Sequence, residues 1–482
     1  MAKIQALKLQ EANTGTGTLL FAPVWEQTAT GEPSPQGNVE FAQQHIVLCD
    51  LPNINSTFVE TAIANSHCLS FQTSLQKNIA ERFSEIAQAC FELIKKTLSG
   101  KPNGKVLLQV VIPNNPKEAL FAGLSGLLKT AALENPLMAG QIILTMPKIS
   151  VEELVAQLQS EKTKLQDKII SYGTGVRSAL RLQEVNAKTQ TPNVIFKDRG
   201  VYLITGGLGG LGLLFAKEIL KQTSSAKIFL AGRSTLTPER KKELDTWSKN
   251  NKHVEYNQLD ITNFDDVNRL LSTIKKEHGQ LNGIIHCAGI NADNYIIKKT
   301  TAEFHEVLKP KVIGTYNLDT ASHDMGLDFM VLFSSVASWL GNAGQADYAA
   351  ANCFMDQFAV YRNNQVELKK RKGKTLSVNW PLWEDGGMTM DMATREMLQE
   401  ITGLQALQTS TGMLSFYRGM ELNQAQVMVM NGDYEKIRQG LYKNNTNVEE
   451  ALPAMKALLQ EVTLPAFLKK PGTSFANNWH CN

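Results

Sequence analysis

The residues best suited to chemistry lie in the second half of the chain. Residues 329–335 form an apolar run that predicts a strand, and this run ends in Ser335. A helix-forming stretch follows, in which Tyr348 and Asn352 are four residues apart and so share one face. A tyrosine can donate a proton, and a serine a hydrogen bond, to an oxygen on which negative charge develops. Such a pair suits the reduction of a ketone, because hydride attack on carbon leaves the charge on oxygen.

A second group of residues is suited to binding a dinucleotide. Residues 201–204 predict a strand, which runs into a glycine-rich turn and then into the helical pattern of residues 213–221. Glycines permit a tight turn and close approach of the backbone to a pyrophosphate, whose charge the N-terminus of the next helix meets. The turn consists of Thr205, Gly206, Gly207, Leu208, Gly209, Gly210, Leu211 and Gly212. We expect it to bind the pyrophosphate of a nicotinamide cofactor.

The end of the next predicted strand favours NADPH as that cofactor. The strand covers residues 227–230, and Arg233 and Ser234 follow it. NAD enzymes usually carry an acidic residue here, which accepts a hydrogen bond from the 2′-hydroxyl of the ribose. A guanidinium can instead bind a 2′-phosphate through two parallel hydrogen bonds, which a carboxylate would repel. An ordinary surface arginine at a strand end is the alternative interpretation.

Two further segments are expected near the cofactor. Residues 259–261 close one predicted strand, and residues 283–289 form a buried strand that opens on a turn of small residues. The side chains of His286 and Cys287 are interpreted as parts of the core, because they follow two isoleucines in a buried run. The residues expected to contact the cofactor in these segments are Asp260, Ile261, Ala288 and Gly289.

These segments need a scaffold that brings several strand ends together. From about residue 200 to residue 440 the pattern strand, turn, helix repeats, which is typical of a doubly wound parallel sheet. Residues 1–195 also alternate between strand and helix patterns but have no glycine-rich turn after a strand, so we expect them to fold without performing chemistry. In that half the expected strands are 45–49, 106–113 and 141–147, and the expected helices are 76–97 and 117–134.

The chain therefore divides into three expected parts. These are a structural part (1–195), a catalytic nucleotide-binding part (196–440) and a tail (441–482), with a polar linker at 186–198. The tail contains one amphipathic helix pattern at 448–462, interrupted early by Pro453, and is interpreted as a packing or linker segment.

Composition excludes several classes of function. The 482 residues are long enough for two core-forming domains, and 43% of them are hydrophobic. The 49 basic residues are nearly balanced by 46 acidic ones, which argues against a nucleic-acid partner. The six scattered cysteines lack the spacing of a metal site, and no apolar run predicts a signal peptide or a membrane span. We expect a cytoplasmic protein without a bound metal.

The candidate residues resemble the ketoreductase domains of bacterial modular polyketide synthases, which belong to the short-chain dehydrogenase/reductase superfamily. In that family the tyrosine is followed four residues later by asparagine, and a lysine comes from an earlier helix. The matching lysine here is Lys311, and the matching serine is Ser335. The resemblance extends over about residues 15–440, with residues 21–25 resembling the first strand of the structural subdomain. It implies an α/β fold with a doubly wound Rossmann catalytic subdomain and a truncated Rossmann-like structural subdomain.

The resemblance assigns a role to each residue of the set. Tyr348 is expected to give the proton, Ser335 to orient the carbonyl, and Asn352 to hold Lys311 or a relay water. A free tyrosine has a pKa near 10, so lowering its pKa to about 7 requires about 4 kcal/mol. An ammonium about 4 Å away at an effective dielectric constant near 20 supplies a similar amount, which is the role of Lys311. Taken singly, each residue also has an ordinary structural interpretation. These are a packing residue for Tyr348, a cap for Ser335, a polar helix face for Asn352 and a solvated charge for Lys311.

The substrate and partners also follow from the resemblance. We expect a β-ketoacyl thioester on the phosphopantetheine arm of an acyl carrier protein, within a larger synthase whose Lys- and Asn-rich composition suggests the trans-acyltransferase kind. Asp293 matches the last position of the motif of D-alcohol producers, although a plain turn residue is the alternative, and Leu340 replaces the tryptophan that marks L-alcohol producers. The residues expected to control substrate orientation are Asp293, Leu340, Gln345, Trp383 and Met388.

Two alternative functions remain open. A free-standing short-chain reductase of small ketones would share the same site, and a redox-silent scaffold would share the same fold. Pro381 stands where many members of the family carry glycine, which puts the geometry of the expected active-site lid in question. A monomer is expected for the isolated domain, because the N-terminal half replaces the dimer surface of free-standing relatives.

Overall fold

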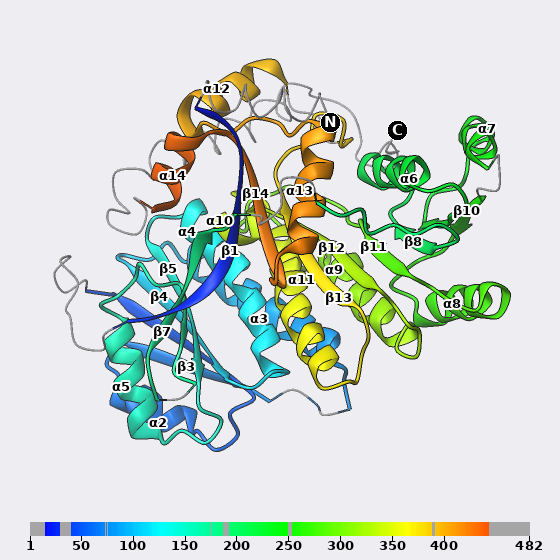
Figure 1. Cartoon of the computed structure of the whole chain (residues 1–482). Coiled ribbons are helices and arrows are strands. Elements are labelled where there is room, and N and C mark those ends of the chain that lie inside the picture. The colour runs from blue at the N-terminus through cyan, green and yellow to red at the C-terminus, as the bar shows by residue number, and fades with distance from the viewer. Residues whose placement is uncertain are drawn as a thin grey trace, which may run out of the picture.

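The fold is described from a computed structural model of the chain. The structure describes residues 15–28, 40–72, 74, 76–173, 175–186, 192–248, 253–387 and 391–442. A single sheet of 14 strands runs through the molecule, and helices cover both of its faces (Figure 1). The expected α/β class is confirmed. The expected tail helix at 448–462 lies outside the described residues, and the division into three parts stays a prediction.

The C-terminal half has the strand order of a doubly wound sheet. Its strands are β8 (Val201–Thr205), β9 (Lys227–Gly232), β10 (His253–Gln258), β11 (Gly283–His286), β12 (Phe329–Ser335), β13 (Lys374–Trp380) and β14 (Gln426–Asp433). They are parallel and lie in the order β10-β9-β8-β11-β12-β13-β14. The order reverses between β8 and β11, where Thr205 pairs with His286. Ligands of open parallel sheets bind outside the carboxyl ends of the strands at such a reversal.

Two groups of helices sandwich this part of the sheet. Its helices are α6 (Gly210–Gln222), α7 (Pro238–Trp247), α8 (Phe264–His278), α9 (Thr301–Ala321), α10 (Ala337–Leu340), α11 (Ala346–Glu367), α12 (Met392–Thr402), α13 (Thr409–Glu421) and α14 (Tyr434–Tyr442). On one face, Phe215 of α6 packs against Phe416 of α13 with ring centroids 5.0 Å apart. On the other face, α8, α9 and α11 share a separate apolar core. Helix α9 begins sharply because Thr300 and Glu303 form a reciprocal capping box.

The N-terminal half continues the same sheet. Its strands are β1 (Thr16–Gln27), β2 (Gln43–Cys49), β3 (Ser66–Phe71), β4 (Val106–Pro113), β5 (Met138–Thr145), β6 (Ile169–Ser171) and β7 (Ser178–Glu184). Its helices are α2 (Ser56–Ala62), α3 (Ile79–Ser99), the 3₁₀ helix η1 (Glu118–Leu124), α4 (Ser125–Glu134) and α5 (Val151–Glu161). The long strand β1 pairs antiparallel with β14 on one side and with β7 on the other. This strand therefore joins the two halves into one sheet.

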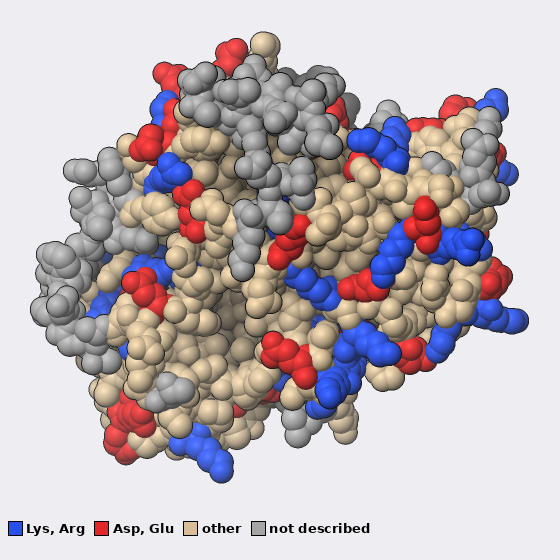
Figure 2. All heavy atoms as spheres, viewed as in Figure 1, with Lys and Arg blue, Asp and Glu red and all other residues tan. Residues whose placement is uncertain are grey.

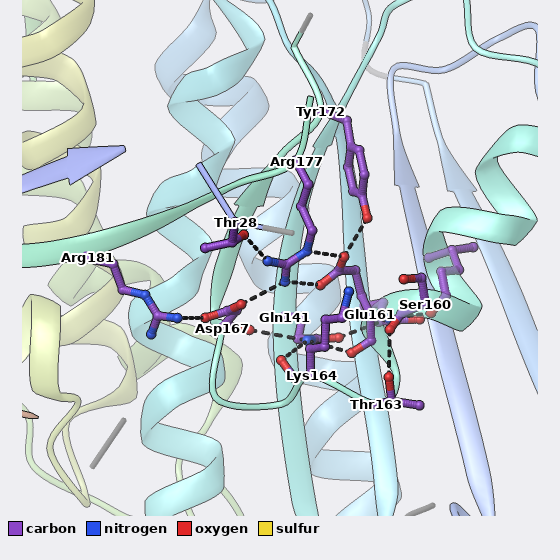
Figure 3. A network of polar contacts seen from close by, with 12 residues as sticks. Thr28, Gln141, Ser160, Glu161, Thr163, Lys164, Asp167, Tyr172, Arg177 and Arg181 are labelled. Atoms are coloured by element: carbon purple, nitrogen blue, oxygen red, sulfur yellow. Dashed lines mark hydrogen bonds and ion pairs between the residues drawn. The ribbon is translucent and has the colours of Figure 1, made fainter. Parts of the chain in front are cut away.

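A buried polar network closes the far end of the N-terminal half (Figure 3). Arg177 is 1% exposed and contacts Glu161 at 2.6 Å and Asp167 at 2.7 Å. Glu161 also accepts a hydrogen bond from the Tyr172 hydroxyl at 2.5 Å. The side-chain amide of Gln141 donates to three main-chain oxygens of the turn after α5. With every charge paired, the network fixes the path of the chain from α5 back to the sheet.

Helices of the N-terminal half pack directly on the helices of the C-terminal half. Phe91 of α3 stacks on Phe304 of α9 with centroids 4.4 Å apart, and Phe83 meets Phe354 of α11 at 4.8 Å. Helix α4 comes closer still, since a Cβ atom placed on Gly126 would lie 2.5 Å from the main chain of Ala349. The N-terminal half thus supports the first two turns of α11 from behind.

Several expected element boundaries are corrected by the structure. The strands expected at 106–113 and 329–335 are confirmed, whereas the strand expected at 141–147 is β5, three residues earlier at its start and two at its end. Helix α3 begins at Ile79 because Asn78 caps it and pairs with Glu81 in a capping box. The helix expected at 117–134 is instead η1 followed by α4. Strand β10 ends at Gln258, so residues 259–261 lie beyond it, in a turn closed by Asp260.

Candidate functional site

The glycine-rich turn lies at the reversal of strand order, between β8 and α6. Gly206 has φ of +66°, a conformation that strongly favours glycine, and a Cβ atom on it would lie 2.9 Å from Ala288. A Cβ on Gly212 would lie 2.5 Å from the main-chain oxygen of Gly206. The turn is therefore compact only because these positions lack side chains. It places Ala288, expected from the sequence near the cofactor, in direct contact with the turn.

The start of α6 is suited to an anion. Its N-cap, Gly209, offers no side-chain oxygen to the first N–H groups of the helix. Such uncapped groups, together with the helix dipole, attract phosphate. A Cβ on Gly210 would lie 2.5 Å from the main chain of Gly386, so the segment after Trp383 lies against the turn. The residues present thus fit a dinucleotide whose pyrophosphate lies on the N-terminus of α6.

The expected ribose site lies at the carboxyl end of β9. The side chains of Arg233 and Ser234 are exposed, and the Arg233 guanidinium has no hydrogen bond or ion pair with any residue that the structure describes. The main chain of this corner is fixed instead, because Gln258 donates to the Arg233 oxygen at 2.9 Å and Tyr256 donates to the Ser234 oxygen at 2.5 Å. The guanidinium is therefore available to a ligand. Asp260 lies two residues after Gln258. Its carboxylate accepts hydrogen bonds from the backbone N–H of Thr262 at 2.9 Å and from the Thr262 hydroxyl at 2.8 Å.

The four residues assigned to chemistry come together from three elements. Ser335 ends β12, Tyr348 and Asn352 lie in the first two turns of α11, and Lys311 lies in the middle of α9. The Lys311 ammonium is 5.6 Å from the centre of the Tyr348 ring and donates to the main-chain oxygen of Phe333 at 2.8 Å. A Cβ on Gly289 would lie 2.7 Å from Cε of Lys311. A continuous path of contacts therefore leads from the glycine turn through residues 288 and 289 to Tyr348.

Burial dominates the electrostatics of this group. It raises the pKa of Tyr348, while hydrogen bonds from the side chains of Ser335 and Asn352 lower it. Burial also lowers the pKa of Lys311 to about 8, although the nearby Cys287 and Asp356 raise it. Lys311 is only 4% exposed. A small change in its surroundings can thus change its charge near neutral pH, which makes this ammonium sensitive to what is bound beside it.

Two side chains near the site have structural roles. The ring of His286 is fully buried, with Nδ1 2.6 Å from the Thr205 hydroxyl and Nε2 3.2 Å from the Pro310 oxygen. Burial lowers the pKa of His286 to about 3, so the ring is neutral. The interpretation of His286 as a core histidine is confirmed. Cys287 is partly buried and packs against the core formed with α6.

Those residues expected to orient the substrate that the structure describes lie at position 293, between positions 340 and 345, and at position 383. Gln345, just before α11, donates from Nε2 to the Asp293 carboxylate at 3.0 Å. Leu340 is half-buried at the end of α10. Trp383 is 2% exposed and packs edge-on against Trp380 at 4.9 Å, within the core beneath the glycine turn. Met388 lies outside the described residues. The roles of these residues stay predictions.

Sequence reasoning missed three charged residues beside the site. Lys299 forms a buried ion pair with Asp347, with Nζ and Oδ2 2.6 Å apart, and Glu134 of α4 accepts main-chain hydrogen bonds from Ile296 and Gly344. Asp347 immediately precedes Tyr348, and this position in the first turn of a helix is the one signal that the sequence offers. Nothing local marks Lys299 or Glu134, because their partners are distant in the chain.

The surface charges, the search for a metal site and the search for a membrane-spanning helix add three observations. Figure 2 shows basic and acidic side chains interspersed on the viewed face, so their fields largely cancel at a distance. Within the described ranges, no three His, Cys, Asp or Glu side chains are grouped as they would be to hold a metal ion. No helix in the part of the chain that the structure describes has the length and apolar character needed to cross a membrane.

Sequence comparison finds relatives among polyketide synthases. Residues 200–385 match the family model described as KR domain. The chain is 37% identical over 449 residues to polyketide synthase PksN and 41% identical over 426 residues to polyketide synthase PksL, both of Bacillus subtilis (strain 168). These alignments cover 91% and 88% of this chain but 8% and 9% of the synthases. The chain thus spans less than a tenth of the length of either relative.

Solved structures that are similar to this chain are also ketoreductases of assembly lines. A ketoreductase domain from the bacillaene assembly line aligns with a TM-score of 0.83 and 38% identity, over 88% of this chain and 100% of that domain. An N-terminal ketoreductase from the macrolactin assembly line aligns with a TM-score of 0.72 and 25% identity, over 92% of this chain and 100% of that one. Both alignments include the N-terminal half as well as the half with the glycine turn.

Proposed function

Because this chain belongs to the ketoreductase domains of polyketide synthases, which are oxidoreductases acting on ketones, we propose that it uses NADPH to reduce a β-ketoacyl thioester to a β-hydroxyacyl thioester. The observation that carries the proposal is the path of contacts from Gly206 through Ala288 and Gly289 to Lys311 and the Tyr348 ring. It links a turn suited to a dinucleotide with a group suited to protonating an oxygen.

The choice of NADPH rests on Arg233. Its exposed guanidinium has no partner among the described side chains, and it follows the strand whose end faces the ribose in doubly wound sheets. A 2′-phosphate would give it two charge-assisted hydrogen bonds. Ser234 is exposed beside it, and residues 205–212 and 288–289 would hold the rest of the cofactor, with Asp260 and Ile261 toward the adenine. The nicotinamide supplies the hydride when bound.

The residues of the chain then supply a proton and charge stabilisation. The hydride adds to the carbonyl carbon, and the carbonyl oxygen takes the proton of the Tyr348 hydroxyl. Ser335 donates a hydrogen bond to the same oxygen and so stabilises the charge that develops on it. Lys311 stabilises the phenolate that remains, because its ammonium is 5.6 Å from the ring centre. Asn352 holds the start of the helix, because its side-chain amide donates a hydrogen bond to the main-chain oxygen of Tyr348 at 2.7 Å.

The substrate and partners belong to the same proposal. Other polyketide synthase domains are the expected neighbours of such a chain, and an acyl carrier protein would deliver the thioester on its phosphopantetheine arm. We assign the D-hydroxyl product, because Asp293 lies in the loop beside the Tyr348 helix, where Gln345 holds its carboxylate. Residues 1–195 act as the structural subdomain, residues 196–440 as the catalytic one and residues 441–482 as the tail.

One assay tests the whole proposal. The chain is mixed with NADPH and a β-ketoacyl thioester carried either by pantetheine or by an acyl carrier protein, and NADPH oxidation is followed by its absorbance while the alcohol is resolved on a chiral column. We expect oxidation with NADPH well above that with NADH, and a D-alcohol. Binding of NADPH without oxidation by any ketone would indicate a silent scaffold, and an L-alcohol would overturn the assigned configuration.

A further inference from the structure

A buried lysine lies between the Tyr348 helix and the loop that carries Asp293. Lys299 is fully buried, and its ammonium is 2.6 Å from Oδ2 of Asp347, which is 1% exposed. The same ammonium donates a hydrogen bond to the main-chain oxygen of Ala292. The other oxygen of Asp347 accepts from the backbone N–H of Tyr348 at 2.8 Å. An unbroken chain of contacts thus connects the backbone of Tyr348 to the residue before Asp293.

The same two segments are joined a second time by the N-terminal half. Glu134, at the end of α4, accepts from the N–H of Ile296 at 2.7 Å and from the N–H of Gly344 at 2.9 Å. Lys95 of α3 donates to the main-chain oxygen of Lys299 at 2.6 Å. The loop of residues 290–299 is therefore held at several points, and one of them, the Lys299 ammonium, contacts the residue directly before Tyr348.

The charges around Lys299 make its ammonium indispensable to this arrangement. Burial raises the pKa of Glu134 to about 7 and that of Asp347 to about 6, and in both cases Lys299 lowers it again. Burial also raises the pKa of Asp293, while the hydrogen bond from Gln345 and the charge of Lys299 lower it. Three carboxyl groups therefore share one buried cation. Without this cation, the repulsion between the carboxylates of Asp347 and Asp293 would be less compensated.

We propose that Lys299 is a positioning residue that fixes Asp293 relative to Tyr348, and so determines which face of the ketone is reduced. The inference rests on the proposed function, because it concerns the geometry of that same site. Lys299 acts through Asp347 and Ala292 and is not itself placed on the reacting atoms. Its contribution should therefore appear in substrate orientation more than in cofactor binding.

The test removes the ion pair without leaving a buried charge. Lys299→Met alone would strand the Asp347 carboxylate, which costs several kcal/mol of stability. We therefore combine Lys299→Met with Asp347→Asn, whose amide oxygen can still accept from the Tyr348 N–H. A second variant, Lys299→Gln, keeps a donor of shorter reach and serves if the pair of substitutions prevents folding.

A matched control exists on the same helix. Arg362 of α11 pairs with Asp319 of α9 at 2.7 Å, and the two side chains are 1% and 5% exposed. Arg362 lies 14 residues after Tyr348, or about 21 Å along the helix. The control combines Arg362→Met with Asp319→Asn. It removes a buried pair between helices, in which Asp319 also contacts Arg371 at 3.0 Å, without touching the loop of residues 290–299.

The readouts are the ratio of D- to L-alcohol, KM for the β-ketoacyl thioester, and Kd for NADPH. For Lys299→Met with Asp347→Asn we expect the alcohol ratio to fall at least tenfold and KM to rise, with Kd for NADPH within twofold of the wild-type value. Lys299→Gln should lose part of the ratio, and the control should lose stability alone. A folded Lys299 variant with the wild-type ratio and KM overturns the inference. Failure of the proposed function looks different, because the wild-type chain would then oxidise no NADPH with any ketone.

Discussion

Replacing Lys311 by methionine should lower turnover strongly without making the protein less stable. The substitution keeps the length of the side chain and removes a charge that is 4% exposed. Burial lowers the pKa of Lys311 from 10.5 to about 8, so a difference of about 2.5 separates the folded from the unfolded state. At about 1.4 kcal/mol for each unit of pKa, a charged Lys311 costs the folded state about 3–4 kcal/mol at pH 7.

Removing the buried charge should stabilise the folded state, but the loss of the Lys311 hydrogen bond offsets part of this stabilisation. Its ammonium donates to the Phe333 oxygen at 2.8 Å, and such a bond from a charged donor contributes about 1.5–3 kcal/mol. Lys311→Met should therefore raise the free energy of unfolding at pH 7 by about 0.5–2 kcal/mol. For activity, an ammonium 5.6 Å from the Tyr348 ring stabilises a phenolate by about 3 kcal/mol at an effective dielectric constant near 20. Its loss should lower turnover about 150-fold.

The difference in stability between Lys311→Met and wild type should depend on pH. Because the folded pKa lies below the unfolded one, the unfolded chain binds more protons between about pH 8 and pH 10.5, and wild-type stability gains on the variant as the pH rises through this window. The advantage of Lys311→Met should shrink by about 1.4 kcal/mol between pH 7 and pH 9. Urea unfolding at both pH values, beside steady-state NADPH oxidation, measures both quantities.

Lys168 provides a matched control in the other half. Burial lowers its pKa to about 8 as well, and its ammonium donates to one main-chain oxygen, that of Leu165, at 2.6 Å. Lys168→Met should change stability in the same direction and leave turnover unchanged. The reasoning about burial would be refuted if Lys311→Met and wild type differed in stability by the same amount at pH 7 and at pH 9. Undiminished turnover would refute the role given to Lys311.

Three further substitutions test other parts of the site. Tyr348→Phe should lower kcat by about 10²–10⁴-fold while NADPH binding, followed by its fluorescence, is retained; a kcat close to that of wild type would contradict Tyr348 as the proton donor. Arg233→Asp should raise KM for NADPH at least tenfold more than KM for NADH, with Arg269→Asp on the exposed face of α8 as the control; equal changes for both cofactors would exclude a 2′-phosphate contact. Gly126→Ala should lower both turnover and the midpoint of thermal unfolding, because its Cβ would lie 2.5 Å from the main chain of Ala349; unchanged kinetics would show that α11 can move without consequence.

Much of the catalytic half could be predicted because its signals are local. The glycine turn between residues 205 and 212 joins a strand to a helix within a short stretch, and steric limits on the backbone leave few other conformations. The spacing of Tyr348 and Asn352 fixes a common helix face for the same reason. Local patterns of this kind depend on neighbours in the chain, so a single sequence is enough to reveal them.

The parts that could not be predicted depend on partners far away in the chain. Strand β1 pairs with β14, more than 400 residues later, and its own alternation does not identify that partner. The contacts of Glu134 with Ile296 and Gly344 span more than 160 residues. Trp383 is buried because α13 packs over it, with a Cβ on Gly412 only 2.2 Å from its ring, and its role toward the substrate stays a prediction. Only the folded chain brings such groups together.

The N-terminal half therefore helps to position the candidate site, although its sequence has no glycine-rich turn after a strand. Helix α4 touches the Tyr348 helix at Gly126, and Glu134 at its end holds the two loops that flank the substrate site. A displacement of about 1 Å in a reacting group can cost about 100-fold in rate. A Cβ at Gly126 would need a shift of this size to reach ordinary contact with Ala349. The packing of the N-terminal half thus positions the first turns of α11, which carry Tyr348, and the solved ketoreductases align with this chain over both halves.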